Sequence, residues 1–192
     1  MNFFQKTFFK LKIVIYGFQL CCILLGLVPV SSSAEVPIIR EHQLKAVFLY
    51  RFAHFVSWPA SAFVSSNAPF RICIWGEDPF GNQIDVAVAN ERIKNRPITV
   101  SRIHDVEEMA SCQIVFASKS KQRYKAHIFT FVKNRPILTV SDMENFANRG
   151  GMIEFFNFGN KVRFIIAPKH VKTANLKISS RLLQIAKIAE GE

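Results

Sequence analysis

Short stretches in which apolar and polar residues alternate with a period of two predict several β-strands along the chain. The clearest is FRICIW, residues 70–75, in which Phe70, Ile72 and Ile74 share one face. Two alternating runs on either side of NFGN predict an antiparallel hairpin. The predicted strands are residues 70–75, 98–103, 112–117, 137–140, 152–156 and 161–167.

Segments in which apolar residues recur every three or four positions predict helices between and after these strands. The first of these helices is expected to end before Pro59, because proline cannot continue a helix. Strands that alternate with helices are typical of an α/β protein, so we expect a mainly parallel sheet covered on both faces, with the hairpin as an antiparallel C-terminal edge. The predicted helical segments are residues 41–56, 79–89, 105–111, 121–133 and 176–189, with one helical turn within 141–151.

Residues 1–34 have the layout of a secretory signal peptide. Three lysines precede the apolar run IVIYGFQLCCILLGLV, and small residues at the end of the segment suit cleavage before Glu35. Because the apolar run is shorter than the roughly 20 residues that cross a bilayer, cleavage is favoured over the alternative of a retained membrane anchor. We therefore expect an exported protein that does not span the membrane, with residues 35–192 as a single α/β domain.

The predicted mature chain is strongly basic. Loss of the three lysines leaves 22 of the 25 basic residues against 14 acidic ones, a formal charge of +8. An exported protein meets no nucleic acid, so the charge indicates an acidic protein surface, an anionic lipid or an anionic ligand as the partner. A solvated basic surface without a partner is the alternative.

Only Cys73 and Cys112 remain after the predicted cleavage. Two lone cysteines in an oxidising compartment most often form one disulfide, and a metal pair or a reactive thiol are the alternatives. Neither cysteine has a second cysteine or a histidine at a metal-binding spacing, and no two of the five histidines lie three or four residues apart. We therefore expect no metal site.

Motifs for catalysis or nucleotide binding are missing from the sequence. The turn GEDPFG after the first strand lacks the Lys-Ser/Thr end of a phosphate-binding loop, and neither Gly-x-Gly-x-x-Gly nor Gly-x-Ser-x-Gly occurs. We therefore predict a protein that is not an enzyme. Two alternatives stay open, a solute-binding module with its ligand near residues 76–81 and an unrecognised hydrolase.

Seven segments, in order along the chain, resemble the YfiR-like family of periplasmic proteins. Together they cover essentially all of the predicted mature chain, and the first helix, the GGMI turn and the LKISSRLL end are specific in combination. The segments are LKAVFLYRFAHFVSWP, FRICIWGEDPFG, NRPITVSRI, CQIVFAS, ILTVSDMENFANRGGMIEF, KVRFIIA and LKISSRLLQIAKI.

The resemblance implies a Rossmann-like three-layer α/β sandwich without a cofactor. It also implies a non-enzymatic periplasmic regulator that binds and represses the periplasmic sensor domain of an inner-membrane diguanylate cyclase, which lowers cyclic di-GMP and biofilm formation. In the family an outer-membrane lipoprotein sequesters the regulator, and homodimers occur. The inter-strand cysteine pair of the family falls on Cys73 and Cys112, whereas a second, later pair has no counterpart here.

A basic patch of the family, an arginine and a histidine ahead of the last helix, falls on Lys177 and Ser179. Lysine keeps the charge but loses the planar fork of arginine, and serine removes a group that titrates near neutral pH. With Arg163 and Arg181 these residues are our candidate surface for a partner or an anion.

The aromatic segment 42–59 is too short and too charged for a membrane span, and its wide apolar arc is typical of a core helix. Tyr50, Arg51 and His54 lie on a narrow polar stripe of this helix. We expect the stripe to face solvent, a second copy of the chain or the membrane sensor.

Overall fold

The computed structural model describes residues 35–190 of the 192-residue chain. The predicted signal peptide, residues 1–34, lies outside the described residues, as do residues 191–192. The division of the chain into a signal peptide and one domain therefore stays a prediction.

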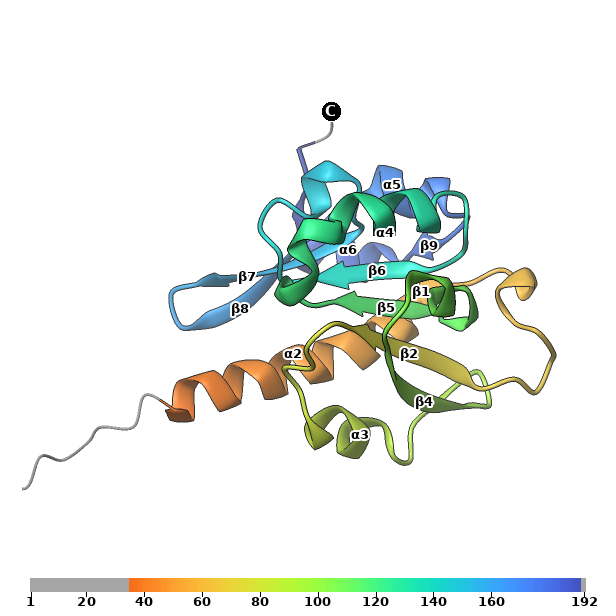
Figure 1. Ribbon diagram of the computed structural model, residues 1–192, viewed down its shortest axis with the longest axis horizontal. Helices are drawn as coiled ribbons and strands as arrows, with labels where there is room; N and C mark the ends of the chain where they lie inside the picture. Colours follow the sequence, from red (N-terminus) through yellow and green to blue (C-terminus); the bar gives the residue numbers. More distant parts are fainter. Residues whose placement is uncertain (1–34, 191–192) are drawn as a thin grey trace, which may run out of the picture. The chain divides into compact units, whose positions relative to one another are not determined.

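A mixed sheet of eight strands runs through the described chain (Figure 1). Its strands are β2 Phe70–Trp75, β3 Arg92–Ile93, β4 Arg96–Ile103, β5 Ile114–Ala117, β6 Leu138–Ser141, β7 Ile153–Phe158, β8 Lys161–Ile166 and β10 Lys187–Ile188. Their order in the sheet is β10-β8-β7-β6-β5-β2-β4-β3. The strands β4, β2, β5, β6 and β7 pair in parallel with one another, and so does β10 with β8, whereas β8 is antiparallel to β7 and β3 to β4.

Helices connect these strands, and a small second sheet closes the fold. The α-helices are α2 Glu35–Phe55, α3 Asn82–Val88, α4 Lys125–Val132, α5 Pro168–Thr173 and α6 Ser180–Ile185, and the 3-10 helices are η1 Ala60–Ala62, η2 Val106–Ser111, η3 Lys119–Tyr124 and η4 Ala147–Arg149. The second sheet pairs β1, Val56–Ser57, antiparallel with β9, Lys177–Ile178. Helix α2 is the long orange helix of Figure 1.

Alternate residues of β2 feed two apolar clusters of the core. Ile72 and Ile74 join the larger cluster, which contains buried residues of α2 and α3, whereas Cys73 and Trp75 join the second cluster, which contains residues of α4. Phe52 of α2 is fully buried in the larger cluster. Burial of one such side chain contributes roughly 1.5–3 kcal/mol, so the aromatic residues of α2 hold the helix on the sheet.

The mixed α/β class predicted from the sequence is confirmed. The hairpin predicted around NFGN forms between β7 and β8. Because β3 and β8 run against their neighbours, the sheet is mixed, and the mainly parallel, three-layer Rossmann-like arrangement stays a prediction.

The helix predicted at residues 176–189 is wrong. Only Ser180–Ile185 is helical, as α6, and it is flanked by β9 and β10. Ile178 is drawn into a strand by pairing with Val56, and Ser179 then begins α6 as an extended N-cap residue whose hydroxyl accepts a hydrogen bond from the Leu182 N–H. The apolar positions that predicted one long helix therefore belong to two short strands, β9 and β10, and to the short helix α6 between them.

The first helix is longer than predicted, because it begins at Glu35 rather than at residue 41. Leu49 and Phe52 are buried, which agrees with a core helix. Leu44 is apolar but 41% exposed. It precedes exposed Arg51 by about two helical turns, so it lies on the face of the helix that is turned away from the sheet.

Arg102 of β4 fastens α3 and the preceding turn to the sheet. Its Nη1 and Nη2 donate to the two carboxylate oxygens of Asp85 at 2.9 and 2.6 Å, and its Nε donates to Asp78 at 2.9 Å. The hydrogen bonds from Arg102 lower the pKa of Asp85, and burial raises it. The hydrogen bonds outweigh burial, so the pKa of Asp85 lies below its ordinary value.

Replacement of Arg102 by glutamine is expected to lower the free energy of unfolding at pH 7 by up to about 1 kcal/mol, because both partners are partly exposed and solvent screens the pair. A carboxylate with a depressed pKa stabilises the fold above its unfolded pKa of roughly 3.9, and this contribution is lost as the pH falls through the folded pKa. The difference between wild type and R102Q should therefore shrink in urea titrations below about pH 4. R92Q, on the exposed Arg92, serves as control; an R102Q defect of equal size at pH 7 and pH 3 would contradict the assignment.

Candidate functional site

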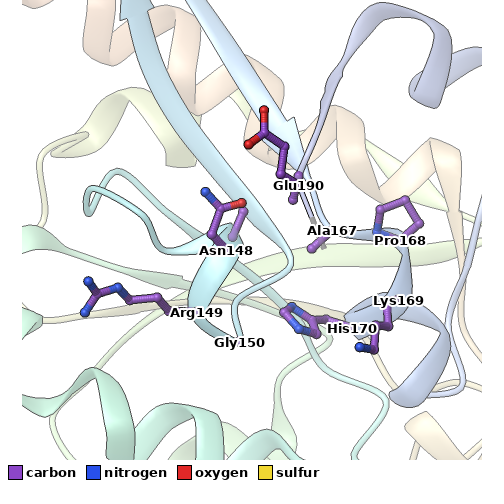
Figure 2. Close-up of a pocket in the computed structure, with 10 residues that line it drawn as sticks. Asn148, Arg149, Gly150, Ala167, Pro168, Lys169, His170 and Glu190 are labelled. Atoms are coloured by element: carbon purple, nitrogen blue, oxygen red, sulfur yellow. The ribbon is translucent and has the colours of Figure 1, made fainter. Parts of the chain in front are cut away.

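A cleft of about 290 Å³ lies where η4, the start of α5 and the end of β10 come together (Figure 2). We call it the His170 cleft. Arg149 and Lys169 bring positive charge to its rim, and Glu190 brings negative charge. The other lining residues are Ala147, Asn148, Gly150, Ala167, Pro168, His170 and Ala189.

A histidine and a glycine pair shape this cleft. His170 Nδ1 lies 2.7 Å from the carbonyl oxygen of Gly151. Because a carbonyl oxygen only accepts, Nδ1 donates this hydrogen bond. Gly150 has a φ of +127°, which L-residues rarely adopt, and a Cβ on Gly151 would collide with the ring of Phe146. Gly150 therefore lines the cleft, and the carbonyl oxygen of Gly151 orients the ring of His170.

The lining of the His170 cleft offers charge and shape but no hydroxyl or thiol nucleophile. Its two cations outnumber its one carboxylate, so an acidic segment would be attracted to its rim.

Three of the four residues of the predicted partner surface lie close together along the chain. Lys177 and Arg181 are exposed, and Ser179 between them uses its hydroxyl to cap α6. Arg163 lies elsewhere: its neighbour Phe164 packs on Phe52 of α2, so the alternation of β8 turns Arg163 to the opposite face of the sheet. The structure therefore places Arg163 apart from the other three residues.

The C-terminal segment also exposes apolar residues, which we call the C-terminal surface together with the cations beside them. Ile185 is 63% exposed and Ile188 is 45% exposed. Arg181 precedes Ile185 by one helical turn on the same face of α6, and exposed Lys187 precedes Ile188 on β10. Successive residues of a strand point to opposite faces, so Lys187 and Ile188 face opposite ways. Because β10 is an edge strand of the described sheet, its outer side is open to a partner.

The predicted stripe on α2 is present as a set of side chains that touch one another. Arg51 and His54 are exposed, whereas Tyr50 is half-buried. The ring centroids of Tyr50 and His54 lie 6.2 Å apart, and the guanidinium of Arg51 lies 6.0 Å from the Tyr50 ring. Arg51 and His54 face away from the core, whereas Tyr50 packs against the larger core cluster. Which partner the stripe meets stays a prediction.

Cys73 and Cys112, the two cysteines that the sequence pairs, are joined as a disulfide in the structure. Cys73 lies on β2, and Cys112 lies between η2 and β5, with the two Cα atoms 6.0 Å apart. Both residues are fully buried in the second core cluster. The bridge therefore ties η2 to the centre of the sheet.

The alternative ligand site at residues 76–81 has little room at its start. A Cβ on Gly76 would lie 2.5 Å from the hydroxyl of Ser120 and 2.8 Å from Cγ of Lys121. The ammonium of Lys121 also lies 5.0 Å from the ring centroid of Trp75. Side chains of η3 thus fill the space at the carboxyl end of β2, where an α/β protein would hold a ligand.

Four residues that line a cleft or are buried with a charge in the structure were not predicted as site residues from the sequence. Arg149 and His170 line the cleft of Figure 2, Lys45 is buried, and Arg71 lines a second cleft. The Glu41-x-x-x-Lys45 spacing was a signal for an ion pair on α2. The others come from contacts between distant segments, which no local pattern records.

In residues 35–190 no group of three His, Cys, Asp or Glu side chains is placed to hold a metal ion. Within the same residues no helix is both long and apolar enough to span a bilayer.

The fold and these surfaces define a small α/β protein with a cleft beside α5 and exposed apolar and basic residues in its C-terminal segment. The comparison with known families narrows this class. The chain belongs to the YfiR/HmsC-like family, whose sequence model matches residues 42–187, from α2 into β10. This family is a regulatory, non-catalytic one. No curated protein matches the chain.

Proposed function

We propose that the chain is a non-enzymatic periplasmic regulator that binds and represses the periplasmic sensor domain of an inner-membrane diguanylate cyclase. Repression would lower cyclic di-GMP and biofilm formation. The observation that carries the proposal is the family match over residues 42–187. An outer-membrane lipoprotein that sequesters the regulator, and a homodimer, belong to the same proposal.

The C-terminal surface supports a mechanism by contact with a partner. Exposed Ile185 and Ile188 would bury apolar area against the sensor, while Arg181 and Lys187 would contact acidic groups at the rim. A regulator that binds one conformation of the sensor more tightly shifts the population toward that conformation, and no chemical step is needed.

Deletion of the gene is expected to raise cellular cyclic di-GMP, and wild-type protein supplied in the periplasm should restore the low level. Ile185→Asp places a charge in the apolar centre of the C-terminal surface and should fail to restore it. Val86→Asp is the matched control, because Val86 is also exposed but lies on α3. Periplasmic levels and circular dichroism of both variants exclude misfolding as the cause.

An unchanged cyclic di-GMP level after deletion would contradict the proposal of a repressor. Full restoration by I185D would instead contradict the docking role of the C-terminal surface. The two outcomes separate the function from the surface that carries it.

A further inference from the structure

A second cleft, of about 400 Å³, lies at the amino ends of β2 and β5, at the opposite edge of the sheet from Gly76. We call it the Arg71 cleft. One wall is the connector of residues 59–69, which loops out beyond the amino end of β2 in Figure 1. The other wall is the end of η2, and Arg71 of β2 lies between the two.

The connector wall is fixed to the sheet by several contacts. Gln113 is buried, and its Nε2 donates to the carbonyl oxygen of Ala62 at 2.6 Å. Arg96 donates from Nη1 to the carbonyl oxygen of Ala68 at 2.6 Å, and its guanidinium lies 3.9 Å from the ring centroid of Phe63. A segment without long regular structure is thereby held in one conformation.

The η2 wall is fixed as firmly. The disulfide of Cys73 and Cys112 ties the end of η2 to β2. Arg71 Nη1 donates to the hydroxyl of Ser111, one residue before Cys112, at 2.9 Å. Both walls are therefore positioned before any ligand arrives, which lowers the entropic cost of binding.

Arg71 lacks an anionic partner in this cleft. Its guanidinium donates to the neutral hydroxyls of Ser111 at 2.9 Å and Ser101 at 3.2 Å, and no carboxylate among residues 35–190 forms an ion pair with it. Glu108, which interacts electrostatically with Arg71, already accepts hydrogen bonds from the backbone N–H groups of residues 104 and 105 through Oε1. A guanidinium has five N–H donors, so Arg71 can hold a carboxylate while it keeps both serine contacts.

Most of the remaining lining of the cleft is apolar, and Ser61, Ser111 and Gln113 are its other polar residues. The apolar lining residues include Phe63, Val64, Ala68 and Pro69. Val64 is 96% exposed, which is unusual for a valine in a segment that is held in one conformation. The volume lies near the lower end of the range for ligand pockets, which is about 300–1,000 Å³. One arginine with an apolar wall suits a single negative charge attached to a compact apolar body.

We propose that the Arg71 cleft binds a small organic monocarboxylate. The carboxylate would take the fork of Arg71 in a bidentate contact, and the apolar body would lie against Phe63 and Pro69. This site is separate from the C-terminal surface, so the proposal does not depend on the function proposed above.

Titration calorimetry with benzoate and with hexanoate, at low ionic strength, tests the proposal on the purified mature protein. We expect saturable binding of at least one of them in the millimolar range or tighter, and at least tenfold weaker binding of the matching neutral amide. Arg71→Gln should weaken carboxylate binding at least tenfold. Arg123→Gln, an exposed arginine on η3 at the other end of β5, should leave it unchanged.

A second pair of variants protects the test against misfolding of R71Q. Val64 is almost fully exposed, so Val64→Glu and Val64→Gln should both fold. The glutamate would compete for Arg71 and weaken carboxylate binding several-fold more than the glutamine. Absence of saturable binding for both carboxylates, or equal binding by V64E and V64Q, would overturn the proposal.

Discussion

Replacement of Lys45 by alanine is expected to lower the free energy of unfolding by about 3–5 kcal/mol, because it leaves a buried carboxylate without its cation. Lys45 Nζ lies 2.6 Å from Glu41 Oε1 and 3.3 Å from Asp142 Oδ2. The side chains of Lys45 and Asp142 are only 5% and 14% exposed. Asp142 Oδ1 is buried and has no hydrogen-bond partner among the described residues, so Lys45 compensates most of the charge of Asp142.

The size of the loss depends on which partner stays behind. Arg51→Ala on the exposed face of the same helix is the control and should change stability by no more than about 0.5 kcal/mol. The double variant Lys45→Met with Asp142→Leu should recover much of the loss, because no uncompensated charge is left in the interior. Urea unfolding at pH 7 measures all three, and a K45A loss no larger than that of R51A would show that the pair is not buried in solution.

The pH dependence of the same cluster has a defined sign. Burial raises the pKa of Glu41, but hydrogen bonds from Lys45 and Asn157 outweigh it and leave the pKa of Glu41 below its ordinary value. The stabilisation from Glu41 is therefore complete above its unfolded pKa of roughly 4.3 and is lost as the pH falls through the folded pKa. The destabilisation of K45A relative to wild type should accordingly be smaller at pH 3 than at pH 7.

Loss of the bridge between Cys73 and Cys112 is expected to cost about 4 kcal/mol. The two residues are 39 positions apart, and release of a loop of this length restores much conformational freedom to the unfolded chain. The double variant Cys73→Ala with Cys112→Ala should unfold at a lower urea concentration than wild type. Reductant should lower the midpoint of wild type toward that of the variant and leave the variant unchanged.

Intact mass spectrometry checks the state of the thiols directly. Protein prepared from the periplasm should gain the mass of two hydrogens on reduction and show no free thiol before it. Two free thiols in such a preparation, or equal unfolding midpoints with and without reductant, would refute a stabilising bridge.

The sequence predicted the centre of the fold well and its last segment badly. FRICIW gave β2 with the observed bounds, because alternation along six residues is a local property of the chain. The segment 176–189 was misjudged because its first strand, β9, exists only by pairing with β1, about 120 residues earlier in the chain. Local periodicity cannot distinguish a helix from a strand whose partner is so distant.

The functional residues also divide into those that the sequence predicts and those that only the structure identifies. Cys73 and Cys112 could be paired from their number alone, whereas the importance of Arg71 depends on what is missing around its guanidinium. In the sequence Arg71 is one polar position of an alternating strand, as Arg102 is in β4. The structure gives Arg102 two aspartates and gives Arg71 only serines. Such a difference arises from the neighbours of a residue and not from its place in a pattern.

The bridge between β2 and the end of η2 also bears on how the protein reaches its compartment. In the proposed setting the chain is made in a reducing cytoplasm, where the disulfide does not persist, and is oxidised only after export. The fold would then lack about 4 kcal/mol of stability during the interval in which the chain must stay loose enough for translocation. Oxidation in the periplasm would then stabilise the folded state and make unfolding less favourable. The bridge would thus delay stable folding until the chain has been exported.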